Sequence, residues 1–131
     1  MHHDVYSGRL RLKGEENRST IGAAYNLASA LNDLQQPEEA KKVLRKMLPV
    51  APRVLGESNE LTLMMRKVYA RTLYENPAAT LDDLSEAATT LEDTARTARR
   101  VLGGAYPMVA EIEQALQASR AALSAREGQR A

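Results

Sequence analysis

The sequence contains no cysteine, which excludes disulfide bonds, thiolate zinc sites and a cysteine nucleophile. It also lacks phenylalanine and tryptophan and has only five tyrosines, so leucine, alanine, valine and methionine supply most of its apolar residues. This mixture favours helices. The 131 residues are enough for about one domain with a core of its own.

Positive and negative charges are almost balanced. Lys and Arg together number 18 and Asp and Glu 17, for a net charge of +1, so no strong field attracts nucleic acid or a membrane surface. No apolar run approaches the about 18 residues of a membrane span. The start, MHHDVYSGRL, lacks the apolar centre of a secretory signal. We therefore expect a cytoplasmic protein that binds neither nucleic acid nor a membrane.

An internal repeat organises the chain. The segment that begins at Gly14 aligns with the segment that begins at Gly56, at an offset of 42 residues, and the agreement continues through a whole helix. A third copy begins at Gly103, at an offset of 47 from Gly56. Because insertions in repeat arrays usually lie in loops, we expect the extra residues near 75–80. The predicted units are residues 1–13, the end of a preceding helix; 14–55, repeat 1; 56–102, repeat 2; and 103–127, a half repeat or capping helix.

Each full unit is predicted to contain two helices. Apolar residues recur at spacings of three and four, which draws one buried face on each helix. Pro37 suits a first helical turn, Gly56 and Gly103 suit helix ends, and Pro49 and Pro52 should bend or interrupt the helix that contains them. The expected helices are residues 19–34, 37–48, 59–75, 80–102 and 107–126, followed by a polar tail at 127–131.

The first residues occupy the place of a second helix. Arg11-Leu12-Lys13-Gly14 aligns with Arg53-Val54-Leu55-Gly56. Either the chain is cut from a longer array, or residues 3–12 form a short starting helix. His2 and His3 are as readily terminal residues as metal ligands.

Several short motifs accompany the glycines. They are Gly14 and Gly56, Asn26-Leu27-Ala28, Glu39-Ala40, Thr62-Leu63, Ala70 and Tyr106-Pro107. This pattern resembles the tetratricopeptide repeat (TPR), and it is most similar to the 42-residue variety of kinesin light chains and related scaffold proteins, approximately L-G-x-x-H-P-x-T-L, then N-N-L-A, then Y-x-E-A. The histidine of that variety is replaced by Asn17, Asn59 and Tyr106, and Gln35 stands where a glycine is expected before the second helix of repeat 1.

The resemblance implies an all-α, right-handed superhelical solenoid of antiparallel helix pairs that serves as a protein-protein interaction scaffold or adaptor. First helices would line a concave groove that holds a peptide or helix of a partner. The groove residues carried over are Tyr25, Ser29 and Asn32 in repeat 1, and Met64, Lys67, Arg71 and Tyr74 in repeat 2; Glu111, Gln114 and Ala118 follow on the third helix. Lys67 and Arg71 share a helical face and suit a carboxylate or phosphate of an acidic peptide, although such a pair is more often a solvated surface.

Other classes of function find less support. The sequence shows no nucleophile with a base, no metal cluster and no phosphate-binding loop, so we expect no enzyme, cofactor or metal. Arg96, Arg99 and Arg100 form the densest basic cluster, which complements a helix C-terminus more readily than it contacts RNA or phosphate. The alternative to a scaffold is a structural module that forms homo-oligomers through exposed repeat ends.

Overall fold

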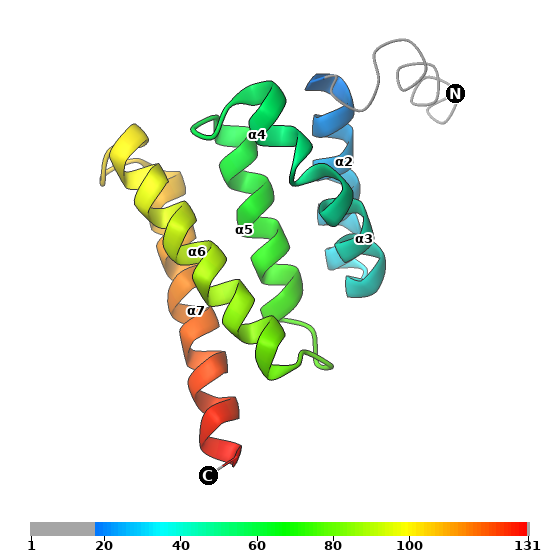
Figure 1. The fold of residues 1–131 in the computed structure, drawn as a ribbon, viewed down its shortest axis with the longest axis vertical. Helices are drawn as coiled ribbons and strands as arrows, with labels where there is room; N and C mark the ends of the chain where they lie inside the picture. Colours follow the sequence, from blue (N-terminus) through cyan, green and yellow to red (C-terminus); the bar gives the residue numbers. More distant parts are fainter. Residues whose placement is uncertain (1–17, 131) are drawn as a thin grey trace. The chain divides into compact units, whose positions relative to one another are not determined.

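The computed structural model describes residues 18–130, and all regular secondary structure in this range is α-helical (Figure 1). The predicted all-α class is confirmed. None of these helices is long and apolar enough to cross a membrane. The predicted starting helix at 3–12 and the first junction, at Gly14, lie outside the described residues. The helices are α2 (Arg18–Asp33), α3 (Pro37–Met47), α4 (Val50–Leu55), α5 (Glu60–Tyr74), α6 (Leu81–Leu102) and α7 (Pro107–Arg130).

The chain falls into two compact units, Met1–Met65 and Arg66–Ala131, and the boundary lies within α5. In the first unit α2 and α3 lie side by side, and α4 contacts both (Figure 1). In the second unit α6 and α7 form a long helical pair, to which residues 66–74 of α5 belong. Fully buried side chains of the two cores include Ile21, Leu44 and Met47 in the first unit and Leu73, Leu91 and Ile112 in the second.

Prolines separate α3 from α4, as predicted. α3 ends at Met47 and α4 begins at Val50, with Pro49 as its N-cap residue. Pro52 lies in the first turn of α4, where a proline costs no backbone hydrogen bond. The second helix of repeat 1 is therefore two shorter helices.

Glycines end α4 and α6 with the same backbone geometry. Gly56 has φ 99° and ψ 153°, and Gly103 has φ 86° and ψ 153°. Each glycine donates its N–H to the carbonyl four residues earlier, at 2.9 and 3.0 Å, and in each case the residue three positions later donates back to the glycine carbonyl at 3.3 Å. Residues with a side chain rarely adopt this region. The alignment of Gly56 with Gly103 therefore pairs structurally equivalent positions.

The turn between α2 and α3 places Gln35 in the left-handed region, with φ 59°. Its N–H donates to the Asn32 carbonyl at 3.0 Å, and the Gln36 N–H donates to the Leu31 carbonyl at 2.8 Å. These two bonds form a Schellman motif, in which glycine is the usual residue at the Gln35 position. The turn thus keeps its geometry without the glycine.

The loop at 75–80 follows α5 directly, where the extra residues of repeat 2 were expected. The Asn76 side chain accepts from the Ala78 N–H at 2.9 Å. Thr80 and Asp83 then form a capping box at the start of α6, with bonds of 3.0 and 2.9 Å. The Arg126 guanidinium donates to the Ala79 carbonyl at 2.6 Å, which ties this loop to α7.

The predicted polar tail is wrong for residues 127–130, because α7 continues through Arg130. The last predicted apolar contact was Leu123, so the apolar pattern no longer supported a helix. The residues that follow are mainly Ala, Arg, Glu and Gln, which favour helix without burial. Their intrinsic propensity extends α7 beyond its packed part.

Candidate functional site

The predicted groove positions form one stripe on each first helix. Spacings of four and then three place side chains on a single helical face. The six positions at these spacings are all partly exposed: Tyr25, Ser29 and Asn32 on α2, and Lys67, Arg71 and Tyr74 on α5. Met64 extends the α5 stripe by a turn and is also partly exposed, whereas Met65 is fully buried. Tyr25, Ser29, Asn32 and Met64 belong to the first unit, and the other three belong to the second.

The structure brings three of the seven predicted residues into one depression of the second unit. Lys67, Arg71 and Tyr74 of α5 line it together with Glu111, Gln114 and Ala115 of α7, and we call this set the α5–α7 groove. Its volume is about 260 Å³. Small-molecule sites usually span about 300–1,000 Å³. The α5–α7 groove therefore suits one or two side chains of a larger ligand better than a whole cofactor.

Both cations of the α5–α7 groove have carboxylate partners. Lys67 Nζ donates to Glu111 Oε1 at 3.0 Å, and the Glu111 side chain is 59% exposed. Arg71 donates through Nε and Nη2 to Glu75 at 3.4 and 3.3 Å. The Arg71–Glu75 pair is exposed on both sides and is worth only about 0–1 kcal/mol, whereas the Lys67 side chain is 16% exposed. A ligand carboxylate that replaces Glu111 therefore has to take over its ion pair with Lys67.

Tyr74 adds a hydroxyl group to this surface. Burial raises the pKa of the Tyr74 phenol, the charge of Glu75 raises it further, and Arg71 opposes the shift. The phenol therefore stays protonated at neutral pH and can donate as well as accept a hydrogen bond. With the Gln114 amide, the α5–α7 groove offers both donors and acceptors to a polypeptide backbone.

Sequence reasoning missed how the groove positions pair. Lys67 and Glu111 lie 44 residues apart, so no local pattern connects them. The repeat alignment did identify Glu111 and Gln114 as groove positions, and this was the usable signal. Tyr69 was assigned to packing: it is 4% exposed, and its hydroxyl donates to Glu86 at 2.7 Å.

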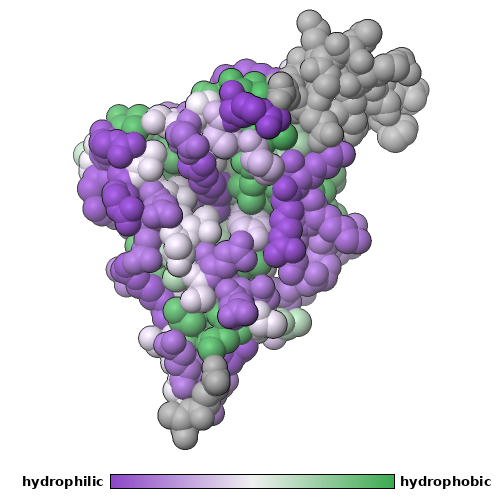
Figure 2. All heavy atoms as spheres, viewed as in Figure 1, coloured by the Kyte–Doolittle hydropathy of each residue, from purple (hydrophilic) through white to green (hydrophobic). Residues whose placement is uncertain are grey.

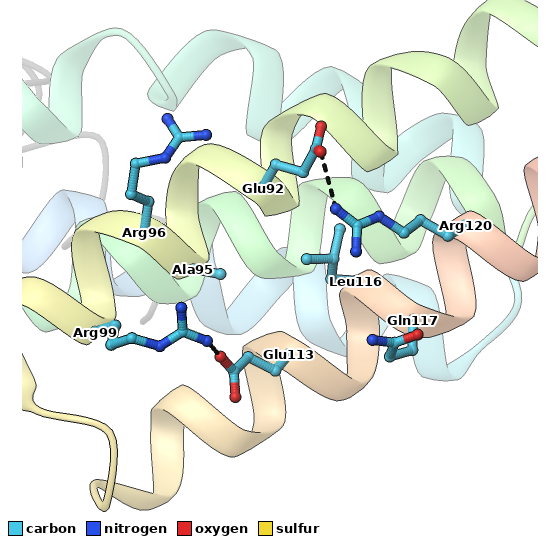
Figure 3. Close-up of a pocket in the computed structure, with 8 residues that line it drawn as sticks. All are labelled: Glu92, Ala95, Arg96, Arg99, Glu113, Leu116, Gln117 and Arg120. Atoms are coloured by element: carbon cyan, nitrogen blue, oxygen red, sulfur yellow. Dashed lines mark hydrogen bonds and ion pairs between the residues drawn. The ribbon is translucent and has the colours of Figure 1, made fainter.

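A second depression, of about 440 Å³, lies along α6 and α7 (Figure 3). Arg99 pairs with Glu113, and Arg120 donates to Glu92 at 2.9 Å, so two ion pairs cross between the helices. Its lining residues are Glu92, Ala95, Arg96, Arg99, Glu113, Leu116, Gln117 and Arg120.

The basic cluster predicted on α6 borders this second depression. Arg96 extends away from the two cross-helix pairs (Figure 3) and donates to Asp93 at 3.1 Å. Arg99 is held by Glu113. Ligand pockets are usually lined mainly by apolar side chains, whereas charged side chains dominate here. We interpret the second depression as a set of ion pairs that joins α6 to α7.

The face of the molecule shown in Figure 2 is largely polar. On the face shown in Figure 2, hydrophilic and intermediate residues cover most of the described chain, and the apolar areas are small and separated. Among residues 18–130, no group of three or more His, Asp or Glu side chains is arranged to hold a metal ion. The α5–α7 groove brings together three of the seven predicted binding residues, Lys67, Arg71 and Tyr74.

No family model matches the chain, and neither the comparison with curated proteins nor that with solved structures found a match.

Proposed function

We propose that this chain is a non-enzymatic protein-binding scaffold built from tetratricopeptide-like repeats, and that the α5–α7 groove holds a peptide or helix of a partner protein. The observation that carries the proposal is the meeting of Lys67, Arg71 and Tyr74 with Glu111 and Gln114 in one depression. On the repeat alignment, Lys67 and Gln114 hold corresponding positions of successive first helices. A ligand that lies along the predicted groove positions of α5 therefore meets an equivalent position on α7.

The stacked solenoid is part of the same proposal. The helices α5, α6 and α7 cannot each bury an apolar face alone. Successive repeats therefore stack and leave a continuous surface. The shared geometry at Gly56 and Gly103 supports equivalent junctions between successive units, and the resemblance to tetratricopeptide repeats is the basis for proposing a right-handed superhelix.

The side chains of the α5–α7 groove favour an acidic segment. Lys67, Arg71, Tyr74 and Gln114 supply donors for carboxylate or carbonyl oxygens. An acidic side chain of the partner would take the place of Glu111 at Lys67, because Glu111 is the exposed member of that pair. The displaced Glu111 carboxylate would then accept from the partner's backbone.

A peptide array tests this proposal. Acidic peptides and their charge-reversed counterparts would be screened against the full-length chain, and the best acidic peptide measured by fluorescence anisotropy. We expect the double variant Lys67→Glu/Arg71→Glu to weaken binding about tenfold or more, because charge-assisted hydrogen bonds contribute about 1.5–3 kcal/mol. Glu111→Gln should strengthen binding, since it removes the competing carboxylate.

The matched control is Lys42→Glu/Lys46→Glu, two exposed lysines of α3 with the same spacing as Lys67 and Arg71. This control should bind as the unmodified chain does. Unchanged binding by a folded Lys67→Glu/Arg71→Glu variant would remove both residues from the site and refute the groove.

Self-association is the second candidate function, and one observation favours it. Leu27 on α2 and Leu34 in the turn that follows α2 are 51% and 66% exposed, the highest values among the large apolar side chains of the described residues. Sedimentation velocity across a concentration series tests it, because a self-associating module gains mass with concentration whereas a scaffold that binds other proteins stays monomeric.

A further inference from the structure

The turn that joins α6 to α7 lies at one end of this helical pair and is flanked by basic residues (Figure 1). Its sequence is Val101-Leu102-Gly103-Gly104-Ala105-Tyr106-Pro107-Met108. Val101 is 43% exposed and Tyr106 is 39% exposed, which places both among the exposed large apolar side chains of residues 18–130. Arg96, Arg99 and Arg100 lie on the last two turns of α6, and all three are exposed. We call residues 96–108 the α6–α7 tip.

The junction at Gly56 provides an internal comparison for the α6–α7 tip. At an offset of 47 residues the tip aligns with residues 49–61, and the two junction glycines have nearly the same backbone angles. Where the Gly56 junction has Glu57, Ser58, Asn59 and Glu60, the tip has Gly104, Ala105, Tyr106 and Pro107. The backbone geometry of a junction therefore requires neither the tyrosine nor the loss of the two acidic residues.

The two junctions also differ in charge. Residues 94–110 contain three Arg and no Asp or Glu, for a net charge of +3, whereas the aligned residues 47–63 contain one Arg and two Glu, for a net charge of −1. The balanced charge of the whole chain, on which the expectation of no membrane binding rested, conceals this local excess. Arginine complements the C-terminal end of a helix, but the last turn of α4 has Arg53 as its one basic residue. A helix end of this kind therefore does not need three cations.

The arginines of the α6–α7 tip remain accessible to a ligand. Arg99 pairs with Glu113 and Arg96 with Asp93, yet the two arginine side chains are 60% and 70% exposed. Because a guanidinium group has five N–H donors, a paired arginine keeps donors for a second anion. At a rise of about 1.5 Å per residue, all three arginines lie within about 8 Å of Val101 along the axis of α6.

We propose that the α6–α7 tip binds the surface of a lipid bilayer that contains anionic lipids. Val101 and Tyr106 enter the interfacial layer, where tyrosine is favoured because its ring is apolar and its hydroxyl group is polar. The arginines then lie at the level of the headgroups, where anionic lipids attract basic residues.

Two other ligand classes match the α6–α7 tip less well. A nucleic acid would pair with the arginines but offers no apolar layer to Val101. A peptide is usually held in a groove or along a sheet edge, whereas these residues lie at the end of a helical pair. The proposal concerns attachment to one face of a bilayer, and it does not depend on the α5–α7 groove.

Co-sedimentation of the full-length chain with lipid vesicles tests the proposal. Vesicles of phosphatidylcholine would be compared with vesicles of phosphatidylcholine and phosphatidylserine. We expect binding to the anionic vesicles alone, and weaker binding at high salt, because salt screens the attraction between charges. Arg96→Gln/Arg100→Gln should weaken binding about tenfold or more, since each basic residue near an anionic surface contributes a factor of about five.

A graft provides a second variant with a known backbone solution. Gly104→Glu/Tyr106→Asn/Pro107→Glu installs the residues of the Gly56 junction in the tip, so the variant should keep its helical circular dichroism and lose vesicle binding. The matched control is Arg53→Gln, because Arg53 is exposed and is the counterpart of Arg100 in the Gly56 junction. This control should bind anionic vesicles as the unmodified chain does.

Four outcomes would overturn the proposal. They are equal binding to both kinds of vesicle, binding to neither, unchanged binding by the folded graft, and an equal loss of binding in Arg53→Gln. Binding to an RNA oligonucleotide but not to vesicles, abolished by Arg96→Gln/Arg100→Gln, would assign the arginines to nucleic acid and would also overturn it. Vesicle binding that Lys67→Glu/Arg71→Glu abolishes would move the lipid contact to the α5–α7 groove and refute the tip.

Discussion

The adjacent glycines Gly103 and Gly104 provide a matched test of the repeat junction. Gly103 has φ 86°, whereas Gly104 lies outside the positive-φ region, and a Cβ built at either position meets no atom within 4 Å. Alanine at Gly103 therefore costs backbone strain alone, about 1–3 kcal/mol. Both alanines gain about 0.4–1 kcal/mol by restricting the unfolded chain. The unfolded-state gain cancels in the comparison, so the two variants should differ by the strain itself.

Urea unfolding followed by circular dichroism measures this difference. We expect Gly104→Ala to raise the free energy of unfolding slightly and Gly103→Ala to lower it, with equal denaturant slopes for both variants. Gly56→Ala should lose as much as Gly103→Ala, because Gly56 has nearly the same φ and ψ. If Gly103→Ala proved as stable as Gly104→Ala, the backbone strain assigned to Gly103 would be refuted.

Two further predictions concern single side chains. Gln35→Gly removes a Cβ from a residue with φ 59°, which relieves about 1–2 kcal/mol of backbone strain. The added freedom of the unfolded chain costs about 0.4–1 kcal/mol, so we expect a small gain in the free energy of unfolding measured in urea. A clear loss would contradict the left-handed turn. The raised pKa of Tyr74 means that the folded state holds the phenolic proton more tightly, so this stabilising contribution is complete below pH 10.0 and is lost as pH rises through the folded pKa. Tyr74→Phe should flatten the alkaline decline in stability and remove one step above pH 10.0 from the tyrosinate absorbance titration. An unchanged decline would assign it to other groups.

Helix positions were predictable because local chemistry sets them. Pro37 begins α3, Thr80 caps α6 and Gly103 ends it, and each is a residue type that suits the position. The C-terminal end of α7 was not predictable from apolar periodicity, because residues 127–129 are exposed and carry no apolar side chain. Repeat alignment located the junctions at Gly56 and Gly103, because equivalent positions recur at fixed offsets.

The charge pairing of the site was beyond the sequence. Lys67 with Glu111, and Arg99 with Glu113, join different helices, so each pair depends on the register of packed helices rather than on spacing within one helix. Leu27 was expected on the buried face of its helix from the spacing of apolar residues, and only the structure shows it 51% exposed.

The most direct test of the scaffold is a map of amide chemical-shift changes while the best acidic peptide from the array is titrated into the full-length chain. The account predicts that the largest changes fall on the α5 and α7 residues around Lys67, Arg71, Tyr74 and Gln114. Changes confined to the second depression, around Arg99 and Arg120, or no saturable change with any peptide, would contradict it.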